Sequence, residues 1–210
     1  MNLTTFKQAA GISQALAERW YPHILKATTA FNISTPKRQA AFLAQIGTES
    51  GGFAKVKESL NYSVDGLIAT FPRSRISLEQ CRALGRKPNE KSLPEDRQIK
   101  IANLVYGGRY GNAADEGWKF RGRGLKQITF HDNYLNCGSS LGLDLIANPD
   151  LLLSDANAAM SAGWFWAFNG CSMFADVDDF VGLTKKINGG TNGLADRQAR
   201  WKVAKQFLLA

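Results

Sequence analysis

Residues 37–58 read KRQAAFLAQIGTESGGFAKVKE, and this stretch decides how we interpret the whole chain. It holds two glutamates, Glu49 and Glu58, with a pair of glycines between them at 51–52. Directly before it, Ser34-Thr35-Pro36 combines a hydroxyl cap with a proline whose fixed φ suits a first helical turn. The apolar residues that follow recur at helical spacing. We therefore predict a helix over residues 37–50.

Glu49 lies near the C-terminal end of this predicted helix. Phe42, Ile46 and Glu49 stand at positions i, i+4 and i+7, so they share the core-facing side. Partial burial and the negative end of the helix dipole both disfavour the ionised form of a carboxyl group there. A general acid must carry a proton at neutral pH, so Glu49 is a candidate for that role.

Glu58 has different neighbours along the chain. Lys55, Lys57 and Asn61 make its surroundings polar and basic, which favours an ionised carboxylate. On one continuous helix the two glutamates would face opposite ways, but the glycines at 51–52 stop the helix and let the chain fold back. A protonated acid facing an ionised base is the arrangement of glycosidases. The alternative is that Glu49 only caps a helix end and Glu58 is a solvated surface residue.

The composition indicates a globular protein with an ordinary core, because 44% of the 210 residues are hydrophobic and 21% are charged. No apolar run is long enough for a transmembrane segment, and the first twenty residues lack the apolar region of a signal peptide. We therefore expect a chain that is made in the cytoplasm. Cys81, Cys137 and Cys171 are irregularly spaced, which favours reduced thiols. The two isolated histidines, His23 and His131, predict neither a metal site nor a cofactor.

The net charge of +8 is distributed unevenly. Residues 73–126 carry +7 and residues 185–210 carry +5, whereas residues 127–184 contain no Lys or Arg and carry −7. This pattern favours association with a polyanion, which would be a nucleic acid, an anionic cell-wall polymer or a membrane surface. The other interpretation is that the charge only aids solubility.

Apolar periodicity predicts most of the remaining chain to be helical. We expect one or two helices over residues 5–31, with Pro22 as a kink or break, and a short helix over residues 63–71 with Ser63 as its N-cap. Further helices are expected in a stretch that begins at Pro94, within residues 149–169 where Ser154 or Asp155 is the cap, and over residues 178–188 and 194–209. A short hairpin is expected within residues 107–130. We interpret residues 72–117, which are basic and poor in large apolar residues, as a small inserted lobe, and residues 1–71 and 118–210 as the large catalytic lobe. A surface loop region is the alternative for residues 72–117.

The segment 118–134, WKFRGRGLKQITFHDNY, interleaves basic and aromatic side chains. Such a pattern fits single-stranded nucleic acid, in which bases stack on aromatic rings. It fits a sugar groove equally well, since aromatic faces stack on pyranose rings and Arg121 would reach acetyl or carboxylate groups.

Five motifs, in the same order, resemble the family 19 glycoside hydrolases, which are the plant-type chitinases. They are AAFLAQIGTESGGF, KESLNYS, FRGRGLKQITFHDNY, NPDLLLSDANAAMSAGWFW, and TKKINGG followed by ADRQARWK. The resemblance runs from Pro36 to the C-terminus and is greatest to the phage and prophage endolysin branch. Leu125 stands where the family has proline, Asp132 departs from the family tyrosine, and the second carboxylate lies closer to the first than is usual. These departures leave the chemistry intact and bear on whether chitin is the substrate.

The resemblance implies a role for each matching residue. Glu49 would be the general acid, Glu58 the general base that activates water, and Thr129 the hydroxyl that holds this water. Inversion needs roughly 6.5–9.5 Å between the two carboxyl groups. The residues implied in substrate binding or in orienting the catalytic groups are Gln127, Asn133, Asn188, Arg197, Tyr62 and Arg121, with Arg197 paired to a catalytic carboxylate. The alternatives are that Asn188 is a helix cap, Arg197 a surface ion pair and Thr129 a strand residue.

We therefore expect a mainly α, lysozyme-like domain of two lobes with a cleft and little or no β structure. Its expected activity is inverting hydrolysis of β-1,4 bonds in peptidoglycan without a cofactor, by an endolysin that reaches the wall in the periplasm after membrane permeabilisation. We expect a monomer that binds peptidoglycan and no nucleic acid. A chitinase is the closest alternative. A non-catalytic wall- or nucleic-acid-binding module is the second, and a zinc amidase is disfavoured by the isolated histidines.

Overall fold

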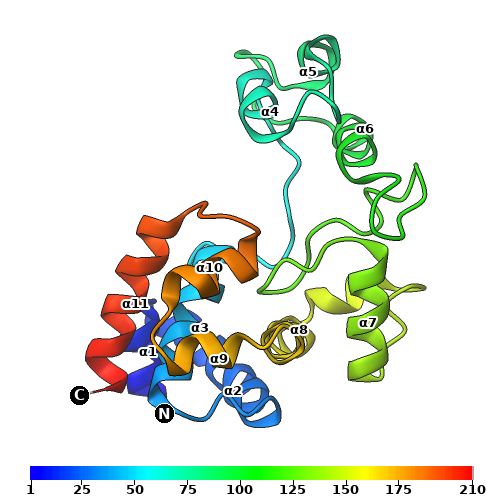
Figure 1. Ribbon diagram of the computed structural model, residues 1–210. Coiled ribbons are helices and arrows are strands. Elements are labelled where there is room, and N and C mark those ends of the chain that lie inside the picture. The colour runs from blue at the N-terminus through cyan, green and yellow to red at the C-terminus, as the bar shows by residue number, and fades with distance from the viewer. Residues whose placement is uncertain (210) are drawn as a thin grey trace. The chain divides into compact units, whose positions relative to one another are not determined.

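A computed structural model describes residues 1–209 of the protein. Within these residues the chain is mainly α-helical, as predicted (Figure 1). The helices are α1 (Leu3–Ala10), α2 (Gln14–Ala30), α3 (Pro36–Glu49), α4 (Val64–Thr70), α5 (Leu78–Leu84), α6 (Glu95–Tyr106), α7 (His131–Leu141), the 3-10 helix η1 (Pro149–Leu153), α8 (Asp155–Phe168), α9 (Cys171–Asp176), α10 (Phe180–Asn188) and α11 (Leu194–Leu208). The described residues form no strand, only isolated bridges such as the one between Ser63 and Arg86. The expected hairpin is therefore wrong, because turns fill residues 107–130.

The start and end signals of α3 act as predicted. The Thr35 hydroxyl accepts a hydrogen bond from the backbone N–H of Arg38 at 3.3 Å, and Pro36 is the first helical residue. After Glu49 the chain turns through Gly51 and Gly52, whose φ angles are 59° and 75°. Only glycine adopts this left-handed region without cost, so the glycine pair ends the helix at Glu49.

The other helices agree with the prediction only in part. Pro22 does not break α2, which runs through it, because the buried Trp20 and Ile24 on either side hold the helix against the core. The helix predicted within residues 149–169 is confirmed as α8, since the Ser154 hydroxyl caps it by accepting from Asn157 N–H, and the 3-10 helix η1 precedes it. The structure also adds α5, α7 and α9, which were not predicted.

The chain forms two compact units, and each is described by itself. Unit 1 comprises Met1–Val56, Arg123–Gln127 and the chain from Cys137 onward, and unit 2 comprises Lys57–Gly122 and Ile128–Asn136. The predicted small lobe, residues 72–117, falls inside unit 2, whose boundaries are wider. The reason is that Leu60 and Leu67, which precede residue 72, are fully buried in the core of unit 2.

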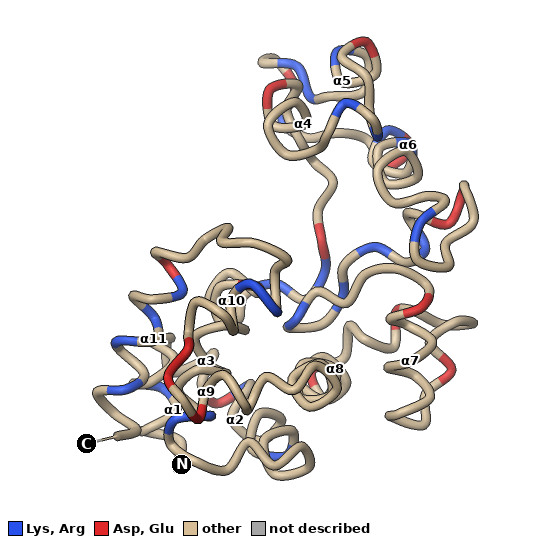
Figure 2. Tube along the Cα trace, in the orientation of Figure 1, with Lys and Arg blue, Asp and Glu red and all other residues tan. Residues whose placement is uncertain are grey.

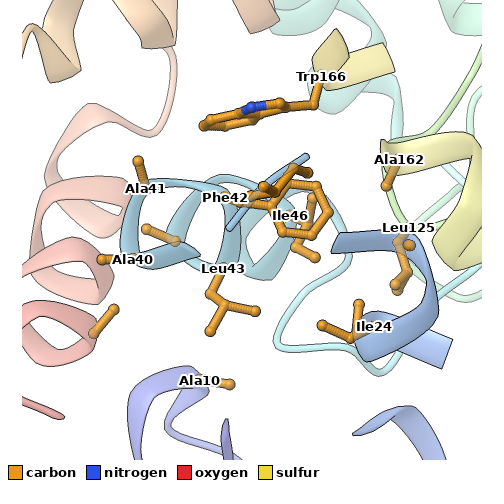
Figure 3. Packing of buried hydrophobic residues seen from close by; sticks show 14 of the residues in the cluster. Ala10, Ile24, Ala40, Ala41, Phe42, Leu43, Ile46, Leu125, Ala162 and Trp166 are labelled. Atoms are coloured by element: carbon orange, nitrogen blue, oxygen red, sulfur yellow. The ribbon is translucent and has the colours of Figure 1, made fainter. Parts of the chain in front are cut away.

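The core of unit 1 is built around α3. This helix packs against α11 and α1, while α2 packs against α8. The rings of Phe42 on α3 and Trp166 on α8 meet edge to face with centroids 5.5 Å apart (Figure 3). Close contact of α8 with the end of α2 requires a glycine, because a Cβ on Gly163 would lie 2.5 Å from a ring carbon of Phe31. The core thereby fixes the direction of α3, which carries Glu49.

Unit 2 has a smaller core of its own between α4, α5 and α6. Its fully buried side chains include Leu60, Leu67, Ile76, Cys81 and Ile101. The guanidinium of Arg73 closes the end of α4 by donating to the carbonyls of Leu67 at 3.0 Å and Ile68 at 2.9 Å. An apolar core and a capped helix end give unit 2 a scaffold that is independent of the core of unit 1.

Figure 2 shows that basic residues occur in both units, whereas the chain from α7 to α9 carries acidic residues and no Lys or Arg. The three cysteines are free thiols and are buried. Burial raises the pKa of both Cys137 and Cys171 to about 12. Among the helices of the described residues, none combines the length and the apolar character that crossing a membrane requires.

Candidate active site

Glu49 is the last residue of α3, and its side chain is 15% exposed. Two cations of unit 1 contact its carboxylate. The Nη2 of Arg197 donates to Oε1 at 2.5 Å, and the Nζ of Lys126 lies 3.5 Å from Oε2. The predicted pairing of Arg197 with a carboxylate is thus present in the structure. Lys126 was not predicted as a partner, although it belongs to the basic segment that the sequence analysis singled out.

A buried polar network holds Arg197 in place. Its Nη1 donates to the side-chain oxygen of Gln45 at 2.5 Å, and Gln45 donates in turn to the hydroxyl of Thr184 at 2.9 Å. Gln45 and Thr184 are almost fully buried, and Arg197 is 4% exposed. Hydrogen bonds to buried charged groups are both strong and costly to lose. Gln45 therefore fixes the guanidinium that meets Glu49.

The turn after α10 supports the same guanidinium. Asn188 is the last residue of α10, and its Nδ2 donates to the carbonyl of Asn192 at 3.1 Å. The Nε of Arg197 donates to the same carbonyl at 3.2 Å. Asn188 thus shapes the turn between α10 and α11, and it belongs with Arg197 and Glu49 in one connected group of unit 1.

Glu58 belongs to unit 2, and both its backbone and its side chain form hydrogen bonds with the backbone of Gly122. Its N–H donates to the carbonyl of Gly122 at 2.9 Å, and the N–H of Gly122 donates to Glu58 Oε2 at 2.9 Å. The other carboxylate oxygen, Oε1, accepts from the hydroxyl of Tyr106 at 2.5 Å. Both oxygens therefore have a donor, and the orientation of the carboxylate is fixed.

The expectation that polar, basic surroundings favour the ionised form of Glu58 is wrong in direction, because its pKa is raised. Burial raises the pKa of Glu58, and the hydrogen bonds from Tyr106 and Gly122 and the charge of Arg121 offset this only in part. The adjacent residues Lys55 and Lys57 form no ion pair with it in the described part of the chain. The reason is that the fold, not the sequence neighbourhood, sets the surroundings of this side chain.

Two phenols and one guanidinium surround Glu58. Burial, together with the negative charge of Glu58, raises the pKa of both Tyr106 and Tyr62. Arg121 is 5% exposed, and its Cζ lies 3.6 Å from the ring centroid of Trp118. The positive charge of the buried Arg121 lowers the pKa of Glu58, which opposes the effect of burial. Tyr62 and Arg121 thus interact electrostatically with Glu58, and their role in binding substrate stays a prediction.

The remaining predicted residues lie in the segment of residues 127–133. Gln127, in unit 1, has a φ of 59° and donates from Nε2 to the carbonyl of Gly124 at 2.8 Å. Thr129 and Asn133, in unit 2, are joined by a bond from Asn133 Nδ2 to the carbonyl of Thr129 at 2.8 Å. Thr129 as a residue is half-buried, and it does not lie in a strand. Left-handed backbone at a non-glycine residue such as Gln127 is typical of ligand-binding segments.

Three residues of these networks were not predicted: Lys126 and Tyr106, which contact the carboxylates, and Gln45, which holds Arg197. Gln45 precedes Glu49 by one helical turn, so the spacing i, i+4 was a usable signal. Tyr106 is 48 residues from Glu58, and nothing local marks it. Among the described residues, no group of three or more His, Cys, Asp or Glu side chains is placed to hold a metal ion.

Comparison with known proteins shows which of them this chain is similar to. The family model described as chitinase class I matches residues 106–193. A Haemophilus influenzae protein, named as a glycosyl hydrolase family 19 domain-containing protein, is 35% identical over 198 residues, which cover 89% of this chain and 92% of that protein. Endochitinase 1 of Theobroma cacao is 47% identical over 51 residues, which cover 24% of this chain and 16% of that protein.

The fold of this chain is also similar to that of a solved structure. Chitinase C from Streptomyces griseus HUT6037 superposes with a TM-score of 0.60 at 20% identity, and the match covers 100% of this chain and 76% of that chain. At this identity the likeness shows the mainly α fold alone. The full-length match to the Haemophilus influenzae protein shows the family, so this chain belongs to glycosyl hydrolase family 19 and is a glycosidase.

Proposed function

We propose that this glycosidase is an endolysin that hydrolyses the β-1,4 bonds of peptidoglycan glycan strands with inversion. The observation that carries the proposal is that each unit supplies one carboxylate with a hydrogen-bonded setting of its own, Glu49 beside Arg197 and Glu58 beside Tyr106. Inverting hydrolysis needs two such groups, one to protonate the leaving oxygen and one to activate water.

In the proposed mechanism Glu49 is the general acid and Glu58 the general base. A raised pKa makes the ionised form of Glu58 a stronger base toward water than an ordinary carboxylate. Thr129 is proposed to hold the attacking water through its hydroxyl. Gln127 and Asn133 are proposed to bind the glycan, and Asn188 and Arg197 to orient Glu49.

Peptidoglycan is favoured over chitin by charge. The protein carries +8, and chitin is uncharged, whereas the bacterial wall is anionic. A chitinase is the second candidate, and it is supported by the local 47% identity to a plant endochitinase. We propose that the enzyme acts as a monomer on the wall in the periplasm once the cytoplasmic membrane has been permeabilised.

The test is a parallel digestion of purified peptidoglycan and of chitin by wild type, Glu49→Gln and Glu58→Gln, with products identified by mass spectrometry. New reducing ends from peptidoglycan that appear in the wild-type digest and in neither variant digest support the proposal. Chemical reduction of the digestion products before their acid hydrolysis labels the sugar at the new end and identifies it. Free stem peptides with intact glycan would contradict it. Cleavage of chitin alone would favour the chitinase.

The two roles are separated with an aryl glycoside whose leaving group needs no proton. Glu49→Gln is expected to retain much of its activity on this substrate and to lose it on the natural glycan, because only the natural leaving group requires an acid. Glu58→Gln is expected to fail on both. The reverse pattern would exchange the two roles.

A further inference from the structure

A series of aromatic rings in unit 2 leads from Glu58 to the protein surface. The series begins with Tyr106, whose hydroxyl donates to Glu58. The Tyr106 and Phe130 rings meet at a centroid distance of 5.5 Å, and the Phe130 and Tyr110 rings at 4.8 Å. The last ring is not covered, because Tyr110 is 61% exposed. The series therefore ends in an open aromatic face that is continuous with the surroundings of a candidate catalytic carboxylate.

The backbone at this face is held in an uncommon conformation. Tyr110 and Phe130 have φ angles of 43° and 76°, a region that bulky side chains rarely adopt. Hydrogen bonds maintain it: Asp132 N–H donates to the Tyr110 carbonyl at 3.1 Å, and Phe130 N–H donates to the Phe120 carbonyl at 2.9 Å. Strain that the fold sustains in this way is typical of ligand-binding positions. Core packing accounts for Phe130, which is half-buried, but it does not account for an exposed tyrosine.

Arg109 adds a positive charge to the same face. Its guanidinium carbon lies 5.3 Å from the ring centroids of both Tyr110 and Phe130. Nη1 donates weakly to the Val105 carbonyl at 3.4 Å, and no carboxylate of the described residues pairs with Arg109. The nearby Asp132 is engaged with His131 instead, at 3.3 Å. Arg109 thus retains donors in the planar arrangement that binds a carboxylate through two bonds.

We propose that Arg109, Tyr110 and Phe130, named here the Tyr110 platform, form a subsite for an amino sugar that carries a carboxylate. The sugar ring stacks on Tyr110, and the guanidinium of Arg109 binds the acidic substituent. In peptidoglycan this unit is a muramyl residue without a stem peptide, because its lactyl carboxylate is then free, whereas attachment of a stem peptide converts that group into an amide. Chitin has no such group. The inference rests on the proposed function, because it names the feature of peptidoglycan that unit 2 recognises.

The test measures binding by calorimetry in a Glu49→Gln background, so that the ligands stay intact. The probes are two soluble tetrasaccharides of equal length, one of N-acetylglucosamine alone and one that alternates N-acetylglucosamine with N-acetylmuramic acid. The variants are Tyr110→Asn, which removes the ring and tolerates the left-handed backbone, Tyr110→Phe, which keeps the ring, and Arg109→Gln. Phe168→Ala is the matched control, because Phe168 is an exposed aromatic residue of unit 1, 64% accessible.

Tyr110→Asn is expected to weaken binding of both probes by about tenfold, and Tyr110→Phe and Phe168→Ala by less than about twofold. Arg109→Gln is expected to weaken the muramyl probe alone by about tenfold, since only that probe carries a carboxylate. Unchanged melting temperatures would exclude unfolding as the cause.

Wild-type affinity in Tyr110→Asn would overturn the platform. Equal weakening of both probes by Arg109→Gln would overturn recognition of the carboxylate. These outcomes differ from failure of the proposed function, which would show as wild-type cleavage of chitin and not of peptidoglycan. In that case weaker chitin binding by Tyr110→Asn would still support the stacking surface.

Discussion

At the scale of single residues, the two candidate catalytic carboxylates lie in contrasting surroundings. Glu49 meets two cations, Arg197 and Lys126, at the end of a helix. Glu58 meets a phenol and a backbone amide in a buried setting that raises its pKa. The contrast indicates that charge orients the first group, while exclusion of water and two neutral donors control the second.

The Tyr106 hydroxyl stabilises the ionised form of Glu58, so it lowers a pKa that burial raises. In Tyr106→Phe this donor is lost and the pKa of Glu58 is expected to rise further. Because the base must be ionised, the acidic limb of the pH profile of kcat/KM moves to higher pH, and activity at neutral pH falls by roughly tenfold. The measurement is the pH dependence of glycan hydrolysis by the two proteins. An acidic limb that stays in place would remove Tyr106 from the control of Glu58.

Glu58 also affects the free energy of unfolding. Because its pKa is raised in the folded protein, its effect on stability becomes less favourable as the pH rises. A carboxyl group with a raised folded-state pKa adds stability below its unfolded pKa, and this contribution is lost as the pH rises through the folded pKa. Glu58→Gln is therefore expected to raise the free energy of unfolding at pH 7 by ~0.5–2 kcal/mol and to gain less at pH 4.

Thermal unfolding at the two pH values checks this prediction. Glu79→Gln is the control, because Glu79 is an exposed glutamate of α5 and its replacement is expected to change little at either pH. A Glu58→Gln protein that is less stable than wild type at pH 7 would show that the hydrogen bonds to the carboxylate outweigh its burial.

The sequence predicted contacts between residues that are close along the chain, but not contacts between residues that are far apart in it. The helical period from Phe42 to Glu49 predicted that Glu49 is partly buried, and the same period would have identified Gln45. The surroundings of Glu58 could not be found this way, since Tyr106 lies 48 residues away and Gly122 lies 64 away. Only the tertiary fold determines such pairs.

At the scale of elements, the buried network of Gln45, Thr184 and Arg197 joins α3, α10 and α11. It places the guanidinium that meets Glu49, so helix packing and site geometry depend on the same three side chains. A network of this kind is stable when all its groups are satisfied and costly when one is not.

Gln45→Leu removes the acceptor of Arg197 Nη1 and the donor to Thr184. The loss of a hydrogen bond to a buried charge is expected to cost ~2–4 kcal/mol of unfolding free energy and to reduce hydrolysis strongly. Chemical denaturation and the hydrolysis rate measure the two effects. Gln198→Leu, an exposed change on α11, is the control. Wild-type stability in Gln45→Leu would mean that water replaces the lost partner.

Helices with local start signals were predictable, and those without were not. Thr35-Pro36, Ser63 and Ser154 marked their helices correctly. Helix α7 has no such signal, because the N–H of His131 is capped by the side chain of Asn112, 19 residues earlier, at 2.8 Å. Helix α5 is different: its capping box between Ser77 and Gln80 is a local start signal that can be read in the sequence.

At the scale of the whole molecule, the mainly α fold followed from composition and periodicity, but the bounds of unit 2 did not. Leu60 and Leu67 look like any other apolar residues in the sequence, and only packing assigns them to the core of unit 2. The net charge of +8, by contrast, can be read directly from the sequence and belongs to the molecule as a whole.

This charge leads to a prediction about binding. Adsorption of Glu49→Gln protein to purified, anionic cell walls is expected to weaken by roughly tenfold between about 0.05 M and about 0.5 M NaCl, because salt screens long-range attraction. Binding to neutral chitin beads serves as the control and is expected to change little. Sedimentation of the protein with each polymer gives the bound fraction. Wall binding that does not respond to salt would show that contacts other than charge hold the enzyme on its polymer.

The long sequence separation between Glu49 and Arg197, 148 residues, has a consequence for the order of events during synthesis. Arg197 lies on α11, so a nascent chain on the ribosome has the residues of α1 to α10 before it has the partner of Glu49. In the same way, Glu58 has no hydrogen bond from Gly122 until residue 122 has been synthesised. Closing a long loop carries an entropic cost, which is offset only when residues distant in the sequence pack together. A polypeptide that has not yet been translated as far as Arg197 therefore lacks the arrangement of the two candidate catalytic carboxylates.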